Sequence, residues 1–171
     1  INAVSQRAGV ARQTIYNNFG NKRQLFDEAL RHSVVNLFSV LETTDGPLEE
    51  RLFRFGLRFR EVVLSVKNLR MYRLMICEAP RFPKLATGFH EIFAAHGRRR
   101  ISEIIESAMD DNLLRREDAD ETAQVFLDML ASAETTRRLL GGKAAHASAA
   151  AETRHTRRIV AAFLRAHAVP V

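Results

Sequence analysis

Seven polar side chains near the start of the chain are all hydrogen-bond donors or acceptors. They are Arg12, Gln13, Thr14, Tyr16, Asn17, Asn18 and Lys22. Side chains of these types match the edges of nucleic-acid bases and the phosphates of a nucleic-acid backbone. The chemistry to consider first is therefore recognition through hydrogen bonds and charge.

Two short helices at about 1–8 and 11–19 are expected to position these side chains. Gly9 and Val10 join them, Ala8 is small enough for a close approach, and Val10 and Ile15 are apolar. This pattern is typical of a helix-turn-helix, whose second helix enters the major groove of DNA. Lys22 and the amides at the start of the next helix could hold a phosphate and fix the register.

The run from Ala8 to Lys22 resembles the TetR family of transcriptional regulators. It contains Ala8-Gly9-Val10 and then Thr14-Ile15-Tyr16-Asn17-Asn18-Phe19-Gly20-Asn21-Lys22, followed by Leu25-Phe26. The resemblance implies three sets of roles. Thr14, Tyr16 and Lys22 would contact phosphates, Arg12, Gln13 and Asn17 would face bases, and Ile15, Phe19 and Phe26 would be core.

Three departures from that family pattern stand out. Ala11 replaces a serine that often caps the reading helix, and Asn18 replaces a common histidine, although its amide can still donate to phosphate. The family's preceding helix is missing, and Ile1 is not an initiator methionine. We therefore expect the given chain to begin after the true start of the protein.

The whole chain is expected to be helical, because its four prolines and eight glycines fall between stretches of helical apolar spacing. Further helices are predicted at about 21–43, 47–66, 68–79, 83–112, 117–140 and 146–168. The predicted fold is all-α. Residues 1–44 would form an incomplete helix-turn-helix head, and residues 45–171 would form a helical-bundle domain for effector binding and dimerisation.

The run from Leu69 to Leu85, with Glu-Ala-Pro-Arg-Phe-Pro at 78–83, is similar to the C-terminal domain of AefR-like members. This resemblance implies a small-molecule effector without identifying it. Candidate pocket residues are Phe55, Phe59, Met71, Met75, Phe89, Phe93, His96 and Phe126. Ordinary core packing is the alternative for each, since any bundle needs apolar residues at this spacing.

Two late apolar stripes could pair with a second copy in a four-helix dimer interface. The candidate residues are Val125, Met129, Ala133, Ile159, Val160 and Phe163. The alternative is that both stripes face their own subunit.

Other classes of function are disfavoured by what the sequence lacks. It has no long apolar run for a membrane span, and Cys77 is its only cysteine, which fits a cytoplasmic location. Only one Glu-x-x-His pair occurs, Glu152 with His155, whereas a di-metal bundle needs two. We expect no enzyme activity, no metal and no cofactor.

The combined interpretation is a homodimeric regulator that binds an inverted repeat in duplex DNA. Repression, relieved when a small and mostly apolar ligand favours another dimer geometry, is the expected mode. An activating or ligand-independent regulator remains an alternative. A helical module for RNA or protein is a further one, because the net charge of +6 is concentrated at the two ends.

Overall fold

The computed structural model describes residues 1–38, 46–143 and 148–169, and within them all side chains except those of residues 30, 31, 33–38, 85, 89, 93 and 96. Its helices are α1 Asn2–Ala8, α2 Arg12–Phe19, α3 Lys22–Phe38, α4 Leu48–Val63, α5 Val66–Glu78, α6 Pro83–Asp110, α7 Ala119–Leu139 and α8 Ala149–His167. The part of the chain that the structure describes contains no strand, only an isolated bridge between Leu114 and Ala168. The predicted all-α class is confirmed.

Helices α4 to α8 begin and end where local chemistry requires. Side-chain oxygens of Ser65, Asp118 and Ser148 accept hydrogen bonds from the first turns of α5, α7 and α8, which satisfies amides that have no partner inside a helix. Pro83 is the first residue of α6, a position where a missing amide hydrogen costs nothing. Beyond the end of α7, Gly141 has φ 90°, a value that L side chains rarely adopt.

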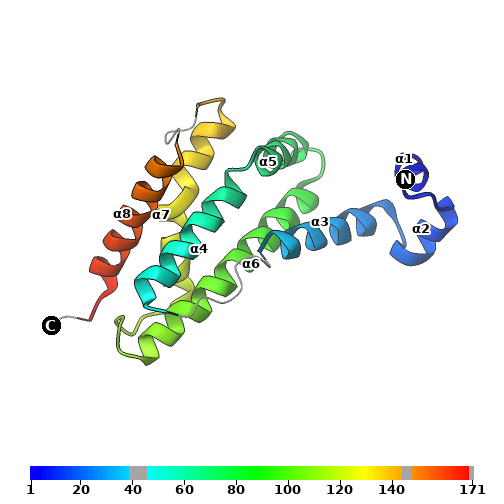
Figure 1. Cartoon of the computed structure of the whole chain (residues 1–171). Helices are drawn as coiled ribbons and strands as arrows, with labels where there is room; N and C mark the ends of the chain where they lie inside the picture. The colour runs from blue at the N-terminus through cyan, green and yellow to red at the C-terminus, as the bar shows by residue number, and fades with distance from the viewer. Residues whose placement is uncertain (39–45, 144–147, 170–171) are drawn as a thin grey trace.

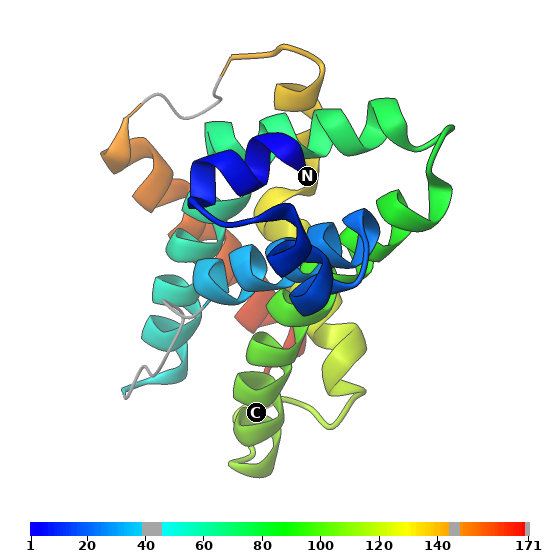
Figure 2. The ribbon, with the colours of Figure 1, turned by 90° about the vertical axis from the view of Figure 1, so that its right-hand side faces the viewer.

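The helices form a body and a separate head (Figure 1). Helices α4, α6, α7 and α8 run alongside one another, α5 lies across one end of them, and α1 and α2 stand apart. Helix α3 connects the two parts, since it leaves the head and packs against α6. Figure 2, turned by 90°, shows α1 and α2 in front of the body with α3 running behind them.

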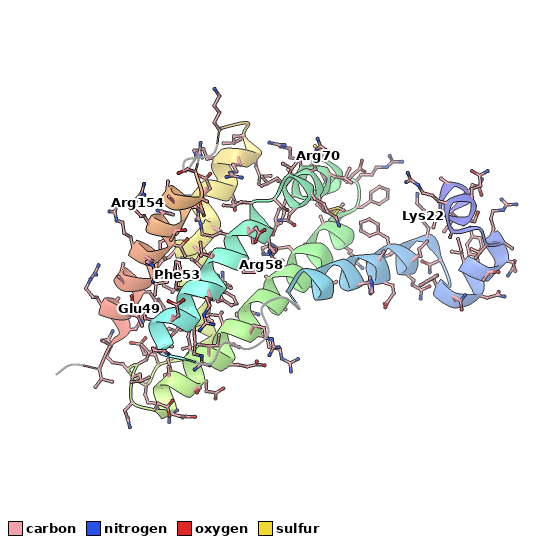
Figure 3. All side chains as sticks on the ribbon, viewed as in Figure 1. Lys22, Glu49, Phe53, Arg58, Arg70 and Arg154 are labelled. Carbon is pink, nitrogen blue, oxygen red and sulfur yellow. The ribbon has the colours of Figure 1, made fainter. Side chains whose placement is uncertain are left out.

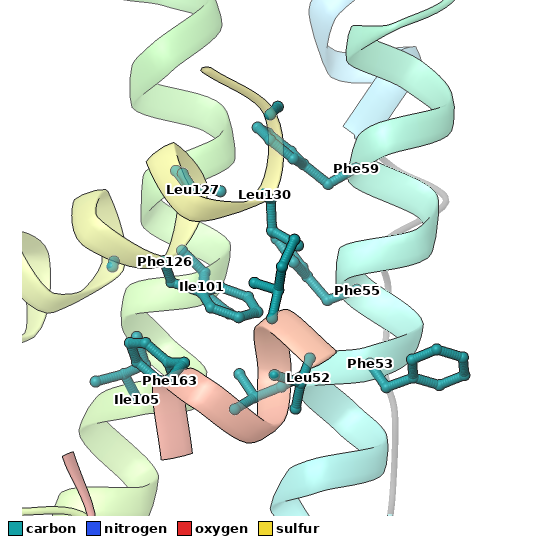
Figure 4. Packing of buried hydrophobic residues seen from close by; sticks show 14 of the residues in the cluster. Leu52, Phe53, Phe55, Phe59, Ile101, Ile105, Phe126, Leu127, Leu130 and Phe163 are labelled. Atoms are coloured by element: carbon teal, nitrogen blue, oxygen red, sulfur yellow. The ribbon is translucent and has the colours of Figure 1, made fainter. Parts of the chain in front are cut away.

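Aromatic rings of α4, α7 and α8 fill the centre of the body (Figure 4). The ring centroids of Phe55 and Phe126 lie 6.4 Å apart, and those of Phe126 and Phe163 lie 4.8 Å apart. Helix α4 is buried on most of its circumference. The helix predicted at about 47–66 ends earlier, at Val63, and Val66 opens α5 with 65% of its surface exposed.

Arg60 is a buried cation that ties three helices of the body together. Only 2% of this α4 residue is exposed. Its Nε donates to Glu152 Oε1 of α8, and its Nη1 donates to the Leu130 carbonyl of α7. Removing one partner of a buried ion pair strands a charge in the core, which makes such a tie costly to break.

The stripe expected on α8 for a dimer interface faces inward instead. Val160 and Phe163 are 1% and 0% exposed, and Ile159 is also buried, so all three belong to the core of their own chain. A single chain therefore already covers these three side chains, and their role in a subunit contact stays a prediction. Val125, Met129 and Ala133 on α7 are exposed, and Val125 reaches 46%.

Two glycines within helices offer a test of how tightly α4 is packed. A Cβ added at Gly56 would lie 3.0 Å from both Leu130 Cδ2 and Thr156 Cγ2, whereas one added at Gly88 on α6 would meet nothing within 4 Å. Both Gly→Ala changes gain about 1 kcal/mol of helix propensity. We expect Gly88→Ala to raise the free energy of unfolding. The free energy of unfolding of Gly56→Ala is expected to be about 1–3 kcal/mol lower than that of Gly88→Ala, because the added methyl group overpacks the contact with Leu130 and Thr156.

Urea unfolding followed by circular dichroism measures both changes. Equal stabilisation by the two substitutions would contradict close packing of α4 against α7 and α8 at Gly56.

Candidate nucleic-acid interface

The turn between α1 and α2 depends on Gly9. Its φ of 66° lies in the left-handed region, where a glycine carries no Cβ penalty. The Gly9 amide donates to the Gln6 carbonyl at 3.3 Å, and the Val10 amide donates to the Ser5 carbonyl at 3.1 Å. These bonds close α1 and redirect the chain within three residues, so that α2 begins at Arg12.

Helix α2 is held by one side chain and presents the others outward. Ile15 is 4% exposed and is the only buried residue of α2. Phe19, expected in the core with it, is half-buried. All seven residues of the predicted DNA-binding set are exposed: Arg12, Gln13, Thr14, Tyr16, Asn17, Asn18 and Lys22. The structure thus places the whole set on the surface of the head.

Hydrogen bonds already order part of this polar face. Gln13 Nε2 donates to Asn17 Oδ1 at 2.9 Å, one helical turn away. Asn18 Nδ2 donates to the Thr14 carbonyl at 2.9 Å, and Arg12 Nη1 donates to Asn2 Oδ1 at 3.2 Å. A side chain held in one rotamer loses less entropy when it binds, so this face is partly preorganised.

The start of α3 differs from the expectation that its amides are open to a phosphate. Asn21 Oδ1 accepts hydrogen bonds from the amides of Arg23 and Gln24, each at 3.0 Å. Those two amides are occupied, so they are not available for the phosphate contact predicted there. An asparagine directly before a helix is a known capping signal, and sequence reasoning overlooked it.

Helix α3 carries the head into contact with the body through Phe26. This half-buried ring belongs to a small apolar cluster around Met75, together with Met71, Tyr72 and Ile92. Burial also raises the pKa of the Tyr72 hydroxyl above its usual value, so this group is neutral near pH 7. The cluster joins α3 to α5 and α6.

The residues expected to line an effector pocket are not all brought together. Phe55 and Phe59 stack with centroids 5.8 Å apart, and Phe126 packs beside them in the buried core. Met75 lines two cavities, one of about 460 Å³ between α5, α6 and α7 and one of about 790 Å³ between α3, α5 and α6, which the three rings do not reach. Met71 is half-buried beside Met75. Phe89, Phe93 and His96 lie outside the described side chains.

Comparison with protein families decides what this arrangement belongs to. Residues 50–169 match the family model described as the AefR-like transcriptional repressor, C-terminal domain, and residues 1–29 match that of the bacterial regulatory proteins, tetR family. The chain belongs to the TetR family. The first match spans most of the body, and the second contains α1, α2 and the start of α3.

Several solved structures share the fold of this chain. A putative TetR-family transcriptional regulator from Mesorhizobium loti superposes with a TM-score of 0.81 at 22% identity, covering 97% of this chain and 85% of its own. The Flavonoid-responsive Regulator FrrA gives 0.82 at 24% identity, with 100% and 87% covered. A TetR transcriptional regulator from Agrobacterium tumefaciens gives 0.77 at 24% identity, with 96% and 81% covered. No curated protein matched the chain.

Membership in this family implies regulation of transcription through DNA binding by the helix-turn-helix head. The family is generally non-enzymatic. Within residues 1–38, 46–143 and 148–169, no helix is both long and apolar enough to cross a membrane.

The missing side-chain cap of α2 gives a direct test of how the head is stabilised. Ala11 has the extended backbone of a helix cap, with φ −66° and ψ 148°, but its side chain accepts no hydrogen bond. We expect Ala11→Ser to stabilise α2 by about 1 kcal/mol, because its hydroxyl can accept from the amides of the first turn. Slower amide hydrogen exchange in α2 would report the gain.

The matched control is Ala3→Ser, the same change within α1 at an exposed position. It adds no cap and is expected to be neutral or slightly destabilising. Equal protection of α2 in both variants would contradict the capping argument.

Proposed function

We propose that this protein is a homodimeric repressor that reads an inverted repeat in duplex DNA and is released by a small-molecule effector. The observation that carries the proposal is the helix-turn-helix, whose short α2 buries Ile15 and exposes a continuous polar face. Residues 1–44 act as the DNA-binding head, and residues 45–171 form the effector-binding and dimerisation domain.

The exposed residues of the head divide between affinity and specificity. Thr14, Tyr16 and Lys22 contact phosphates, which positions α2 without reading sequence. Arg12, Gln13 and Asn17 reach base edges in the major groove, where guanidinium and amide groups match distinct base patterns. Asn18 is a further phosphate donor, although its amide now donates to the Thr14 carbonyl.

The exposed side of α7 supports dimerisation. Val125, Met129 and Ala133 recur every fourth residue on this helix, and all three are exposed in the single chain. An apolar stripe of this kind is stabilised when a second copy covers it. A two-fold axis through this contact would place two heads on successive major grooves about 34 Å apart.

Release from DNA follows from how the head is attached. Helix α3 touches α5 and α6 through the cluster around Met75, next to both cavities that Met75 lines. A ligand that binds better when α3 sits differently shifts the population toward that arrangement. Both heads then no longer fit one operator, and repression ends.

Substitutions on α2 test which residues set affinity and which set sequence preference. Tyr16→Ala is expected to weaken binding to all duplexes alike, because it removes a phosphate contact. Arg12→Ala is expected to change the preferred base at one position in each half-site, with a loss of about 1–3 kcal/mol on the original site. Selection from a random duplex pool, followed by titration of the enriched repeat, measures both.

Tyr16→Phe is the matched control, because it removes only the hydroxyl and keeps the ring. It is expected to reproduce most of the affinity loss of Tyr16→Ala if the hydroxyl carries the contact. Unchanged affinity and preference after both Tyr16→Ala and Arg12→Ala would show that α2 is not the reading helix.

A charge placed on the α7 stripe tests the dimer. Val125→Glu is expected to raise the dimer dissociation constant by at least about tenfold, since burying an unpaired carboxylate is unfavourable. Val66→Glu is the matched control, because this valine of α5 is also exposed but lies off the stripe. Sedimentation equilibrium distinguishes the two, and equal dissociation constants would place the interface elsewhere.

A further inference from the structure

A cavity of about 790 Å³ lies where the head meets the body, and its function is not explained by the fold alone. It opens between the first turns of α3, the end of α5 and the start of α6. The turn between α5 and α6 is on the side of the body that faces the head (Figure 1). The volume of the cavity falls within the range of about 300–1,000 Å³ that small-molecule sites occupy.

The walls of this junction cavity combine apolar and cationic side chains. The apolar side includes Phe26, Met75, Leu74 and Phe82, and the last two are 48% and 45% exposed. Large apolar side chains left this exposed gain free energy when another apolar group covers them. The cavity therefore has a surface for the hydrocarbon part of a ligand.

The charged side of the cavity has a clear excess of cations. It is lined by Lys22, Arg23, Arg81 and Lys84, with Glu78 as the acidic residue. Arg23 pairs with Asp27 at 3.9 Å, and Arg81 lies 5.1 Å from the centroid of the Phe82 ring. For Lys22 and Lys84 the described part of the chain offers no ion-pair partner. Two ammonium groups are thus open to an anion.

We propose that this cavity binds a small molecule with an apolar body and a carboxylate, the carboxylate lying between Lys22 and Lys84. The apolar body lies against Leu74, Phe82 and Phe26. An ammonium group on a flexible stem suits such a contact, because it can turn toward an anion from several directions.

If the head binds DNA as proposed above, the ligand carboxylate and a DNA phosphate compete for Lys22. Figure 3 labels Lys22 where α3 leaves the head. In the DNA complex the same ammonium contacts a phosphate, so a carboxylate in the cavity and the phosphate compete for one charge. Binding of either ligand then weakens binding of the other by the same factor.

The first experiment uses three probes that separate charge from apolar surface. Octanoate carries both, 1-octanol carries the chain alone, and acetate carries the charge alone. Calorimetry with the full chain is expected to give octanoate at least roughly tenfold higher affinity than either of the others, because a carboxylate and a chain act on different walls. Equal affinity for octanoate and 1-octanol would overturn the proposal.

The second experiment assigns the site. Lys84→Gln is expected to weaken octanoate binding by roughly tenfold and to leave 1-octanol binding unchanged, because one charge-assisted contact is lost. Lys84 lies in the first turn of α6, where a positive charge is unfavourable, so its removal does not threaten the fold. Lys67→Gln, an equal loss of charge at an exposed position of α5 outside the cavity, is expected to change neither affinity. The same loss in both variants would overturn the assignment.

The third experiment measures the coupling to DNA. Octanoate is expected to weaken binding of the selected duplex, and acetate at equal concentration is expected not to. Octanoate binding that depends on Lys84 but leaves DNA affinity unchanged would overturn competition through Lys22. If no duplex is selected at all, the proposed repressor function fails, while the calorimetry still decides the cavity.

Discussion

The contact of Phe26 with the cluster around Met75 is the interaction on which the proposed release from DNA rests. Among the described side chains it is an apolar link between the helix that leaves the head and the helices α5 and α6 of the body. Phe26 is only half-buried, so its contribution falls below the ~1.5–3 kcal/mol of a fully buried ring of this kind. A ligand can outweigh a contact of that size. Because α2 leads directly into α3, a change in the position of α3 also changes the orientation of α2.

The body beyond this contact is built to resist deformation. Phe55, Phe126 and Phe163 interlock in its centre, and Arg60 joins α4 to α7 and α8. Closely packed cores of this kind yield little, so a bound ligand acts most easily at the edge where α5 and α6 meet α3. The proposed junction cavity lies at that edge, which connects its occupancy to the position of the head.

Much of the fold could be predicted because its signals are local. Proline, glycine and capping residues set the ends of α5, α6 and α7, and helical apolar spacing predicted the helix at about 47–66, where α4 lies. The polar face of α2 was predictable for the same reason. The inward direction of the stripe Ile159, Val160 and Phe163 was not predictable, because an apolar stripe looks the same whether its own chain or a second copy covers it. The burial of Arg60 was not predictable either, because its partners Glu152 and Leu130 lie on other helices.

The sequence by itself determined that the chain is helical, where its helices break, and that α2 presents a face of donors and acceptors. Those properties arise from residues within about one helical turn of each other. Only the tertiary structure decided that Lys22 and Lys84 line the same cavity and that Phe26 reaches Met75. Such pairs are separated by dozens of residues, and no local preference specifies how α3 is set against α5 and α6.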